Sequence, residues 1–228
     1  MSLDRKINRI QFLSGNSLKV IAVLTMLIDH LCKIVLQWLL SNYWGAMADN
    51  GQMSWERFRE IDYFIRFDLQ SIGTIAFPLF CFLLAEGFQH TRSKKRYIGL
   101  MLAFALISEV PFDIGFFNAY SRMEGTFPFY LKYQNVFFTL FLGLLTLVCL
   151  ERFSCKSDLP VDRIKSAVLQ VLSVVLFSGI AEGIHCDYGM QGILFISAFY
   201  ICRNHRIYQV LLLSLIHISE PTRRRGIS

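Results

Sequence analysis

The stretch LKVIAVLTMLIDHLCKIVLQWLL, residues 18–40, decides the fold class of this chain. As a helix it measures roughly 34 Å, enough to cross a hydrocarbon core that is about 30 Å thick. Asp29 and His30 lie near its middle. An ionisable residue at that depth is costly, so such residues usually face a bundle interior and mark a functional site. The stretch therefore predicts a membrane protein with a polar centre.

The composition of the whole chain also indicates a membrane protein. Of its 228 residues, 54% are hydrophobic and 18% are charged, whereas about 25% of the residues in a soluble domain are charged. The net charge of +6 does not indicate a nucleic-acid partner, because the basic residues fall in short loops between apolar runs. The six cysteines form no CxxC pair, so we expect neither a disulfide framework nor a zinc site.

Separate apolar segments predict an all-α transmembrane bundle of about six spans, built as one domain over residues 18–212. The basic loops before the first segment and after the second, fourth and sixth fall on one side, which we assign to the cytoplasm together with the N-terminus. Residues 1–17 are expected to lie in the cytoplasm or at the interface. The six segments are residues 18–40, 72–89, 97–110, 136–150, 164–180 and 188–202.

The C-terminal residues of the chain are interpreted as differing in origin from the rest. The run LSLIHISEPTR, residues 213–223, resembles a translated sequencing adapter, and we interpret residues 213–228 as a non-native tail. The apolar residues 207–218 are too few to span a bilayer. A truncated seventh helix and a short native tail at the membrane surface are the alternatives, and His217 is given no role.

Helical spacing relates His30 to other ionisable residues of the first span. Lys19 lies eleven residues earlier, about three turns, so it shares a face with His30 and can reach the cytoplasmic rim. Asp29 points about 100° away from His30 and is predicted to pair with Lys33, one turn further on. The alternative is that His30 is a packing residue and Asp29 only an ion-pair partner.

A second polar group gathers on the predicted outer side, where the third, fourth and sixth segments meet. These residues are interpreted as a substrate-binding cluster. The alternative is a scaffold in which Asn135 and Asp187 are helix N-caps. His185 and Cys186 are not expected to hold a metal with Asp187, because further ligands are lacking. The predicted cluster consists of Glu109, Asp113, Gln134, Asn135 and Asp187.

Five stretches together carry a family resemblance that covers residues 18 to about 201. They read LKVIAVLTMLIDHL, IGTIAFPLFCFLLAEGFQHTRSKKRY, LISEVPFDIGFF, QNVFFTLFLGLL and DYGMQGILF. In this order they resemble the TraX family of conjugation-associated membrane proteins, whose founding member acetylates the N-terminus of pilin. The first two spans are also similar, more distantly, to the acyltransferase-3 superfamily. Lys19 and His30 match its first element, and Glu86 stands close to where it has a serine.

The resemblance implies an acetyltransferase of the bacterial inner membrane that uses acetyl-CoA and no metal. His30 would remove a proton from the acceptor, with Asp29 or a group from another helix orienting the ring. The acceptor would be the N-terminus of pilin or another amine or glycan hydroxyl. A cytoplasmic basic cluster would hold the phosphates of acetyl-CoA, unless it only fixes the topology. That cluster consists of Lys19, Arg92, Lys94, Lys95 and Arg96.

Two other classes of function stay open at this point. A proton-coupled transporter could use ionisable residues within the membrane as a relay, and Asp29, His30, Glu86 and Glu109 are candidates for it. A non-catalytic membrane component of a conjugation or secretion assembly would need none of these residues for chemistry.

Overall fold

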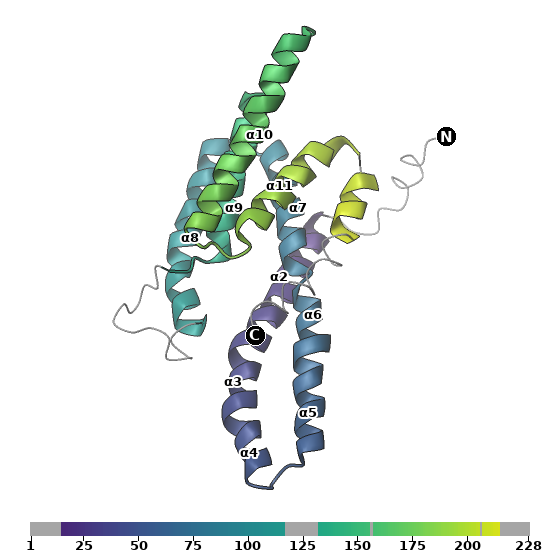
Figure 1. Cartoon of the computed structure of the whole chain (residues 1–228), viewed down its shortest axis with the longest axis vertical. Coiled ribbons are helices and arrows are strands. Elements are labelled where there is room, and N and C mark those ends of the chain that lie inside the picture. Colours follow the sequence, from purple (N-terminus) through teal and green to yellow (C-terminus); the bar gives the residue numbers. More distant parts are fainter. Residues whose placement is uncertain (1–14, 117–131, 156, 206, 215–228) are drawn as a thin grey trace. The chain divides into compact units, whose positions relative to one another are not determined.

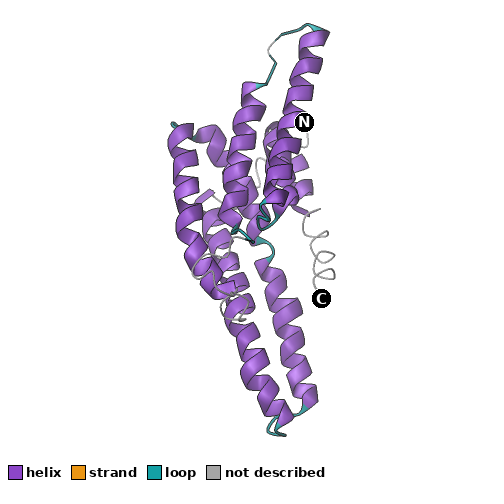
Figure 2. Ribbon diagram, turned by 60° about the vertical axis from the view of Figure 1, so that its left-hand side comes forward, coloured by secondary structure: helices purple, strands orange, loops and turns teal. Residues whose placement is uncertain are grey.

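A computed structural model describes residues 15–116, 132–155, 157–205 and 207–214. Within these ranges the chain consists of helices and turns, with no strand (Figure 2). The prediction of an all-α membrane protein is confirmed, because four helices are long and apolar enough to cross a bilayer. Residues 1–14 of the predicted N-terminal segment and residues 215–228 of the predicted tail, with His217, lie outside the described residues.

The described chain folds as two compact units. The first unit contains residues 15–80, 115–116 and 213–214, and the second contains residues 81–114 and the remaining described residues up to 212. The predicted single domain, residues 18–212, therefore comprises two units. The predicted catalytic residues belong to the first, and the predicted outer polar cluster belongs to the second.

The first unit is a long helical hairpin whose two arms lie side by side (Figure 1). Its arms belong to continuous helical stretches of 35 and 36 residues, joined by a turn in which Gly51 has a φ of 72°. Ser54 caps the second arm by accepting a hydrogen bond from Arg57 N at 3.3 Å. The first arm is α2 (Gly15–His30), η1 (Leu31–Leu36), α3 (Gln37–Leu39), η2 (Leu40–Trp44) and α4 (Gly45–Asp49). The second is α5 (Trp55–Tyr63), η3 (Phe64–Leu69), α6 (Gln70–Gly73) and the start of α7 (Ala76–His90).

Several predicted segments are longer in the structure than their apolar residues indicated, and the first, for example, continues past residue 40 to Asp49. Hydropathy marked residues 72–89, but helix continues back to Trp55, because residues 55–71 are amphipathic and alternate charged with aromatic side chains. Likewise α8 (Lys94–Phe116) continues through Pro111 beyond the predicted end at residue 110. Neighbouring helices in membrane proteins can compensate the backbone hydrogen bond that a proline removes.

The second unit is centred on α9 (Val136–Arg152), which packs against α10 (Pro160–Gly183) and α11 (Gly189–Ile201). A Cβ at Gly143 would lie 2.3 Å from Ile196 Cδ1, so this glycine allows α9 and α11 to approach closely. The fourth and sixth predicted segments are helical, but α9 and α11 have 17 and 13 residues. They are shorter than the about 20 residues that usually span a bilayer.

Candidate functional site

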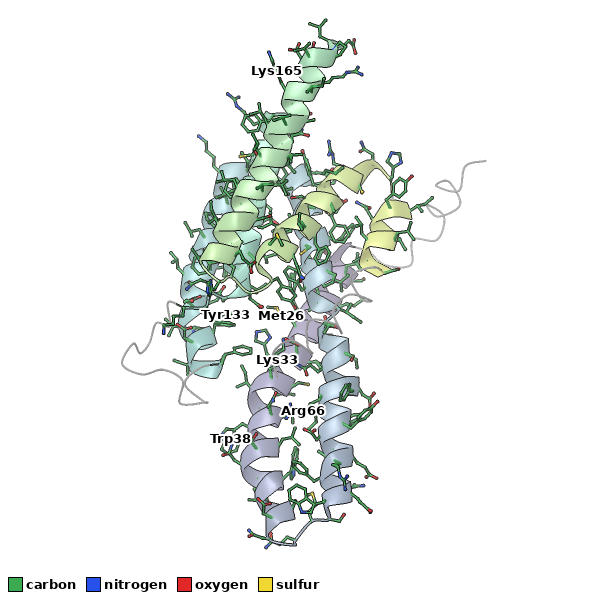
Figure 3. The ribbon with its side chains drawn as sticks, in the orientation of Figure 1. Met26, Lys33, Trp38, Arg66, Tyr133 and Lys165 are labelled. Carbon is green, nitrogen blue, oxygen red and sulfur yellow. The ribbon has the colours of Figure 1, made fainter. Side chains whose placement is uncertain are left out.

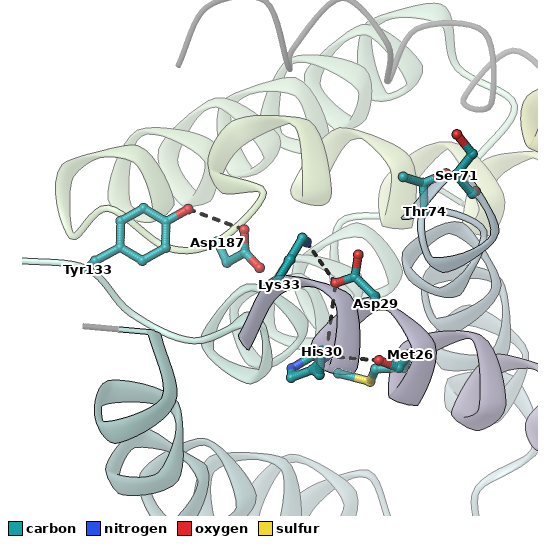
Figure 4. Close-up of polar contacts among 8 residues, drawn as sticks. All are labelled: Met26, Asp29, His30, Lys33, Ser71, Thr74, Tyr133 and Asp187. Carbon is teal, nitrogen blue, oxygen red and sulfur yellow. Dashed lines mark hydrogen bonds and ion pairs between the residues drawn. The ribbon is translucent and has the colours of Figure 1, made fainter. Parts of the chain in front are cut away.

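The buried Asp29 forms an ion pair with the half-buried Lys33, one helical turn along the first arm (Figure 4). The Lys33 Nζ to Asp29 Oδ2 distance is 2.7 Å, and Asp29 is 8% exposed. This is the pair that helical spacing predicted. An ion pair of this kind offsets the desolvation of both charges only when the partners stay in contact, so Lys33 is what allows a carboxylate at the position of Asp29.

The His30 ring is oriented by the backbone of its own helix. Its Nδ1 lies 2.9 Å from the carbonyl oxygen of Met26, and because a carbonyl can only accept, Nδ1 carries the proton. Asp29 Oδ2 is 4.0 Å from Nδ1, beyond hydrogen-bond distance. The predicted carboxylate is therefore near the ring, but the Met26 carbonyl fixes the tautomer. Nε2 keeps its lone pair and can accept a proton.

The surroundings of His30 are partly open and partly aromatic. The His30 side chain is 38% exposed in the described structure. The ring of Phe116, at the end of α8, meets the imidazole edge-on with centroids 5.5 Å apart. A half-open ring with one apolar wall suits a base that a reacting group must reach.

A glycine on the second arm sets the distance between the arms at this point. A Cβ at Gly73 would lie 2.5 Å from Asp29 Cβ and 2.8 Å from Asp29 Cα, so α6 rests directly on the backbone of α2. The Oδ1 atom of Asp29 is buried here without a hydrogen-bond partner in the described part of the chain. Only glycine fits this contact, which our sequence reasoning did not single out.

Replacing Gly73 with alanine should therefore destabilise the protein by about 1 to 3 kcal/mol, the usual cost of overpacking. The new methyl group meets backbone, which cannot rotate away. Gly99, where a Cβ would meet nothing within 4 Å, is the matched control, and its replacement with alanine should lower the midpoint of thermal unfolding far less. Equal midpoints for the two variants would contradict the close contact between Gly73 and Asp29.

A wide helical turn follows His30 directly. Residues Leu31–Leu36 and Phe64–Leu69 form π-helical turns, and the two turns contact each other across the hairpin. Such turns are rare and occur frequently at functional sites. Figure 3 shows Met26, Lys33 and Trp38 following one another along the first arm. This local geometry is a second feature that singles out the region around His30.

The buried carboxylate of Glu109 organises the second unit. Its Oε2 accepts hydrogen bonds from the backbone N of Asn135, at 3.2 Å, and from Asn135 Nδ2. Asn135 Nδ2 also donates to the Ala105 carbonyl at 2.8 Å, while Oδ1 accepts from Phe137 N at 2.9 Å. Asn135 is thus the N-cap of α9, which is the role that the alternative interpretation of the cluster as a scaffold predicted for it. Asp113, one turn beyond Glu109, is fully buried.

The turn between α10 and α11 is attached to the start of α9. Gln134 N donates to the His185 carbonyl at 3.1 Å, and Asp187 N donates to the Gln134 carbonyl at 2.9 Å. The Tyr133 hydroxyl donates to Asp187 Oδ1 at 3.3 Å (Figure 4). Asp187 does not cap α11, whose N-cap position is Tyr188. The structure brings the predicted cluster together as a connected scaffold, and its predicted convergence with His30 stays a prediction.

This turn is also strained and contains a buried thiol. His185 and Tyr188 have φ values of 55° and 65°, a backbone conformation that residues other than glycine rarely adopt. Burial, with a contribution from the Asp187 carboxylate, raises the pKa of the Cys186 thiol to about 12. The thiol is therefore protonated at neutral pH. In the ranges that the structure describes, no three His, Cys, Asp or Glu side chains form a metal-binding group.

The predicted phosphate-binding residues fall into two kinds. Lys94 forms an ion pair with Glu151 at the end of α9 and lies 4.6 Å from the centre of the Phe88 ring. Its charge is thus already balanced within the second unit. Lys19 is exposed on α2 of the first unit, and three further exposed cations lie in the turn before α8 and at the start of α8. These are Arg92, Lys95 and Arg96.

Glu86 lies on α7 and contacts His90 of the same helix. His90 Nδ1 donates to the Glu86 carbonyl at 2.9 Å, and the Glu86 carboxylate is 3.9 Å from the same nitrogen. The His90 side chain is 76% exposed. His90 therefore repeats the backbone hydrogen bond of His30 in an open setting, which makes it a natural control residue.

Comparison with known proteins identifies relatives of the chain. The family model described as "TraX protein" matches residues 14–222. This match overlaps the start of the predicted non-native tail, and that interpretation stays a prediction. The "Probable fimbrial assembly protein FimC, serogroup H1" of Dichelobacter nodosus is 29% identical over 186 residues. The match covers 80% of this chain and 59% of the relative, so the chain spans under two thirds of that protein. No solved structure matches the chain.

Proposed function

Because the chain belongs to the TraX family, we propose that it is an acetyltransferase that moves an acetyl group from acetyl-CoA to an amine or hydroxyl acceptor. Family membership and a relative named for fimbrial assembly support a role as a pilus- or conjugation-associated membrane protein. The N-terminus of a pilin is accordingly the acceptor that we propose first. The proposed location is the bacterial inner membrane, which the chain crosses several times.

The observation that carries this proposal is the hydrogen bond from His30 Nδ1 to the Met26 carbonyl. It leaves Nε2 as a proton acceptor on a ring that is partly exposed. An imidazole has a reference pKa near 6.5, which suits a general base near neutral pH. In the proposed reaction, Nε2 takes the proton of the attacking amine or hydroxyl. The acceptor forms a bond to the acetyl carbon, the carbon–sulfur bond breaks, and the proton returns to the leaving thiolate.

The ion pair beside the ring contributes to the charge balance of this step. At rest, Lys33 neutralises Asp29, so the centre has no net charge. When His30 gains a proton, the Asp29 carboxylate at 4.0 Å attracts the imidazolium. Because the His30 side chain is 38% exposed and Lys33 already neutralises Asp29, this attraction contributes no more than about 1 kcal/mol, as for exposed ion pairs. Asp29 thus acts as a positioning and charge-stabilising residue, while His30 is the catalytic base.

The phosphates of acetyl-CoA are proposed to bind Arg92, Lys95 and Arg96 rather than Lys94. Three exposed cations attract a polyanion, whereas Lys94 is already paired with Glu151. The direct test uses the purified chain, radiolabelled acetyl-CoA and an acceptor peptide with a free N-terminus. Transfer of label to the peptide is expected. The proposal would be contradicted if the protein neither bound acetyl-CoA nor transferred the label.

Charge removal tests where acetyl-CoA binds. Replacing Arg92, Lys95 and Arg96 together with glutamine should weaken CoA binding about tenfold, since three exposed charges at about 0.5 kcal/mol each sum to about 1.5 kcal/mol. Replacing Lys94 with glutamine should change the dissociation constant by less than about twofold. Titration of the purified protein with CoA at two salt concentrations measures both effects. A larger loss for the Lys94 variant would contradict the assignment.

A further inference from the structure

The tip half of the hairpin carries a groove that the proposed acetyl transfer does not use. The groove has a volume of about 390 Å³ and runs between the two arms. A shallower hollow shares Glu60 and Phe64 with it and continues along the second arm. The groove is lined by Leu36, Trp44, Arg57, Glu60, Ile61, Phe64, Ile65 and Leu69.

The lengths of the arms place this groove at a membrane surface. Counting from Lys19 at one rim, about 20 residues of helix cover a hydrocarbon core about 30 Å thick and end near residue 39. Trp and Tyr concentrate at membrane interfaces, and Trp38, Tyr43 and Tyr63 are exposed near this level. Figure 3 shows Trp38 and Arg66 on the two arms of this part of the hairpin. The arms beyond residue 39 therefore rise out of the bilayer.

The polarity of the groove changes along its length. Leu36, Ile65 and Leu69 line the end that lies towards the middle of the bilayer, while Arg57 and Glu60 line the end towards the tip. The two charged side chains are 3.5 Å apart and each is 69% exposed. An apolar channel that ends in one cation and one anion at the interface is complementary to an amphiphile whose head group carries both charges.

The surrounding charges select among such amphiphiles. The groove and the adjoining hollow are lined by three acidic residues, Glu56, Glu60 and Asp68, and by two basic residues, Arg57 and Arg59. An excess of acid disfavours a head group that is only anionic. A primary ammonium can donate hydrogen bonds to a carboxylate, whereas a quaternary ammonium cannot. The chemistry of the lining thus favours a phosphate together with a primary amine.

We propose that the groove between the arms of the hairpin is a binding site for phosphatidylethanolamine. An acyl chain lies along Leu36, Ile65 and Leu69, the phosphate contacts Arg57, and the ammonium contacts Glu60. This site is separate from His30, so it can be present or absent whatever the outcome of the acetyl-transfer assay.

Tryptophan quenching by brominated lipids tests the proposal on the full chain in lipid nanodiscs. The chain has three tryptophans, so Trp38→Phe with Trp55→Phe leaves Trp44, which lines the groove. The two brominated lipids are compared at equal mole fraction in a phosphatidylcholine background. Brominated phosphatidylethanolamine should quench Trp44 about two- to fivefold more than brominated phosphatidylcholine, because exposed ion pairs give a preference of this size. Arg57→Gln with Glu60→Gln should remove the difference.

A matched control comes from the other ion pair of the same arm. Asp62→Asn with Arg66→Gln breaks an exposed pair of the second arm that does not line the groove, and should leave the selective quenching unchanged. Equal quenching by the two lipids, or stronger quenching by brominated phosphatidylglycerol, would overturn the proposal. Weak quenching by all three lipids together with a dimer in light scattering would assign the groove to a second copy of the chain, and would also overturn it.

Discussion

Replacing His30 with glutamine should lower the rate of acetyl transfer by a factor of about 10² to 10⁴, the range that general base catalysis contributes. Glutamine can keep a polar contact with the Met26 carbonyl through its amide, but it offers no basic nitrogen in place of Nε2. The loss is expected in kcat more than in KM, because the proton is accepted in the transition state. A single-turnover assay with labelled acetyl-CoA at saturating acceptor measures this directly.

His90 provides the matched control for this experiment. Its Nδ1 donates to the Glu86 carbonyl at 2.9 Å, the same spacing and distance as in His30 and Met26, but it lies on an exposed part of α7. His90→Gln should leave the rate within a factor of about two, as is usual for exposed residues without a special role. Full activity of the His30 variant, or equal losses for the two variants, would remove His30 from the proposed mechanism.

Replacing Lys33 with methionine should destabilise the protein by about 1 to 3 kcal/mol, because it leaves the buried Asp29 carboxylate without the counter-charge of the half-buried Lys33. A second replacement, Asp29→Asn, should recover most of this loss. The coupling between the two positions is then the difference between the double variant and the sum of the single ones. Unfolding by denaturant in a fixed detergent gives the free energies.

The exposed ion pair between Arg66 and Asp62 has the same spacing of four residues and serves as a comparison. Arg66→Met should cost less than about 1 kcal/mol, as exposed ion pairs contribute little. Equal losses in the free energy of unfolding for the Lys33 and Arg66 variants would show that the burial of Asp29 does not strengthen its ion pair. Loss of acetyl transfer in a stable double variant would in addition indicate that Asp29 stabilises the protonated ring.

Helical periodicity was sufficient to predict the part of the site that lies on one helix. The pairing of Asp29 with Lys33 follows from their spacing alone, and the capping role of Asn135 was a stated alternative. The orienting partner of His30 could not be predicted, because every residue has a carbonyl and only the side-chain rotamer decides which one is used. Gly73 was missed since its role depends on which residue of the other arm faces it.

The extent of the second arm shows a different limit of sequence reasoning. A hydropathy pattern indicates contact with lipid and not the helix itself. Residues 55–71 are rich in charge and therefore lay outside the predicted segments, although they continue the same helical stretch.

Lys94 shows that not every charge in a basic segment is available to a ligand. Its pairing with Glu151 joins residues 57 positions apart, which no local pattern reveals.

The paired π-helical turns have a consequence for how related chains can vary in length. A turn with hydrogen bonds from residue i to i+5 accommodates one more residue than an α-helical turn, and each residue rotates a helix by about 100°. Deleting one residue from Leu31–Leu36 would therefore convert this turn to α-helix and leave Asp29 facing Gly73. The same holds for a deletion of one residue within Phe64–Leu69. Homologues that are one residue shorter in either turn should therefore keep the alignment of the two arms.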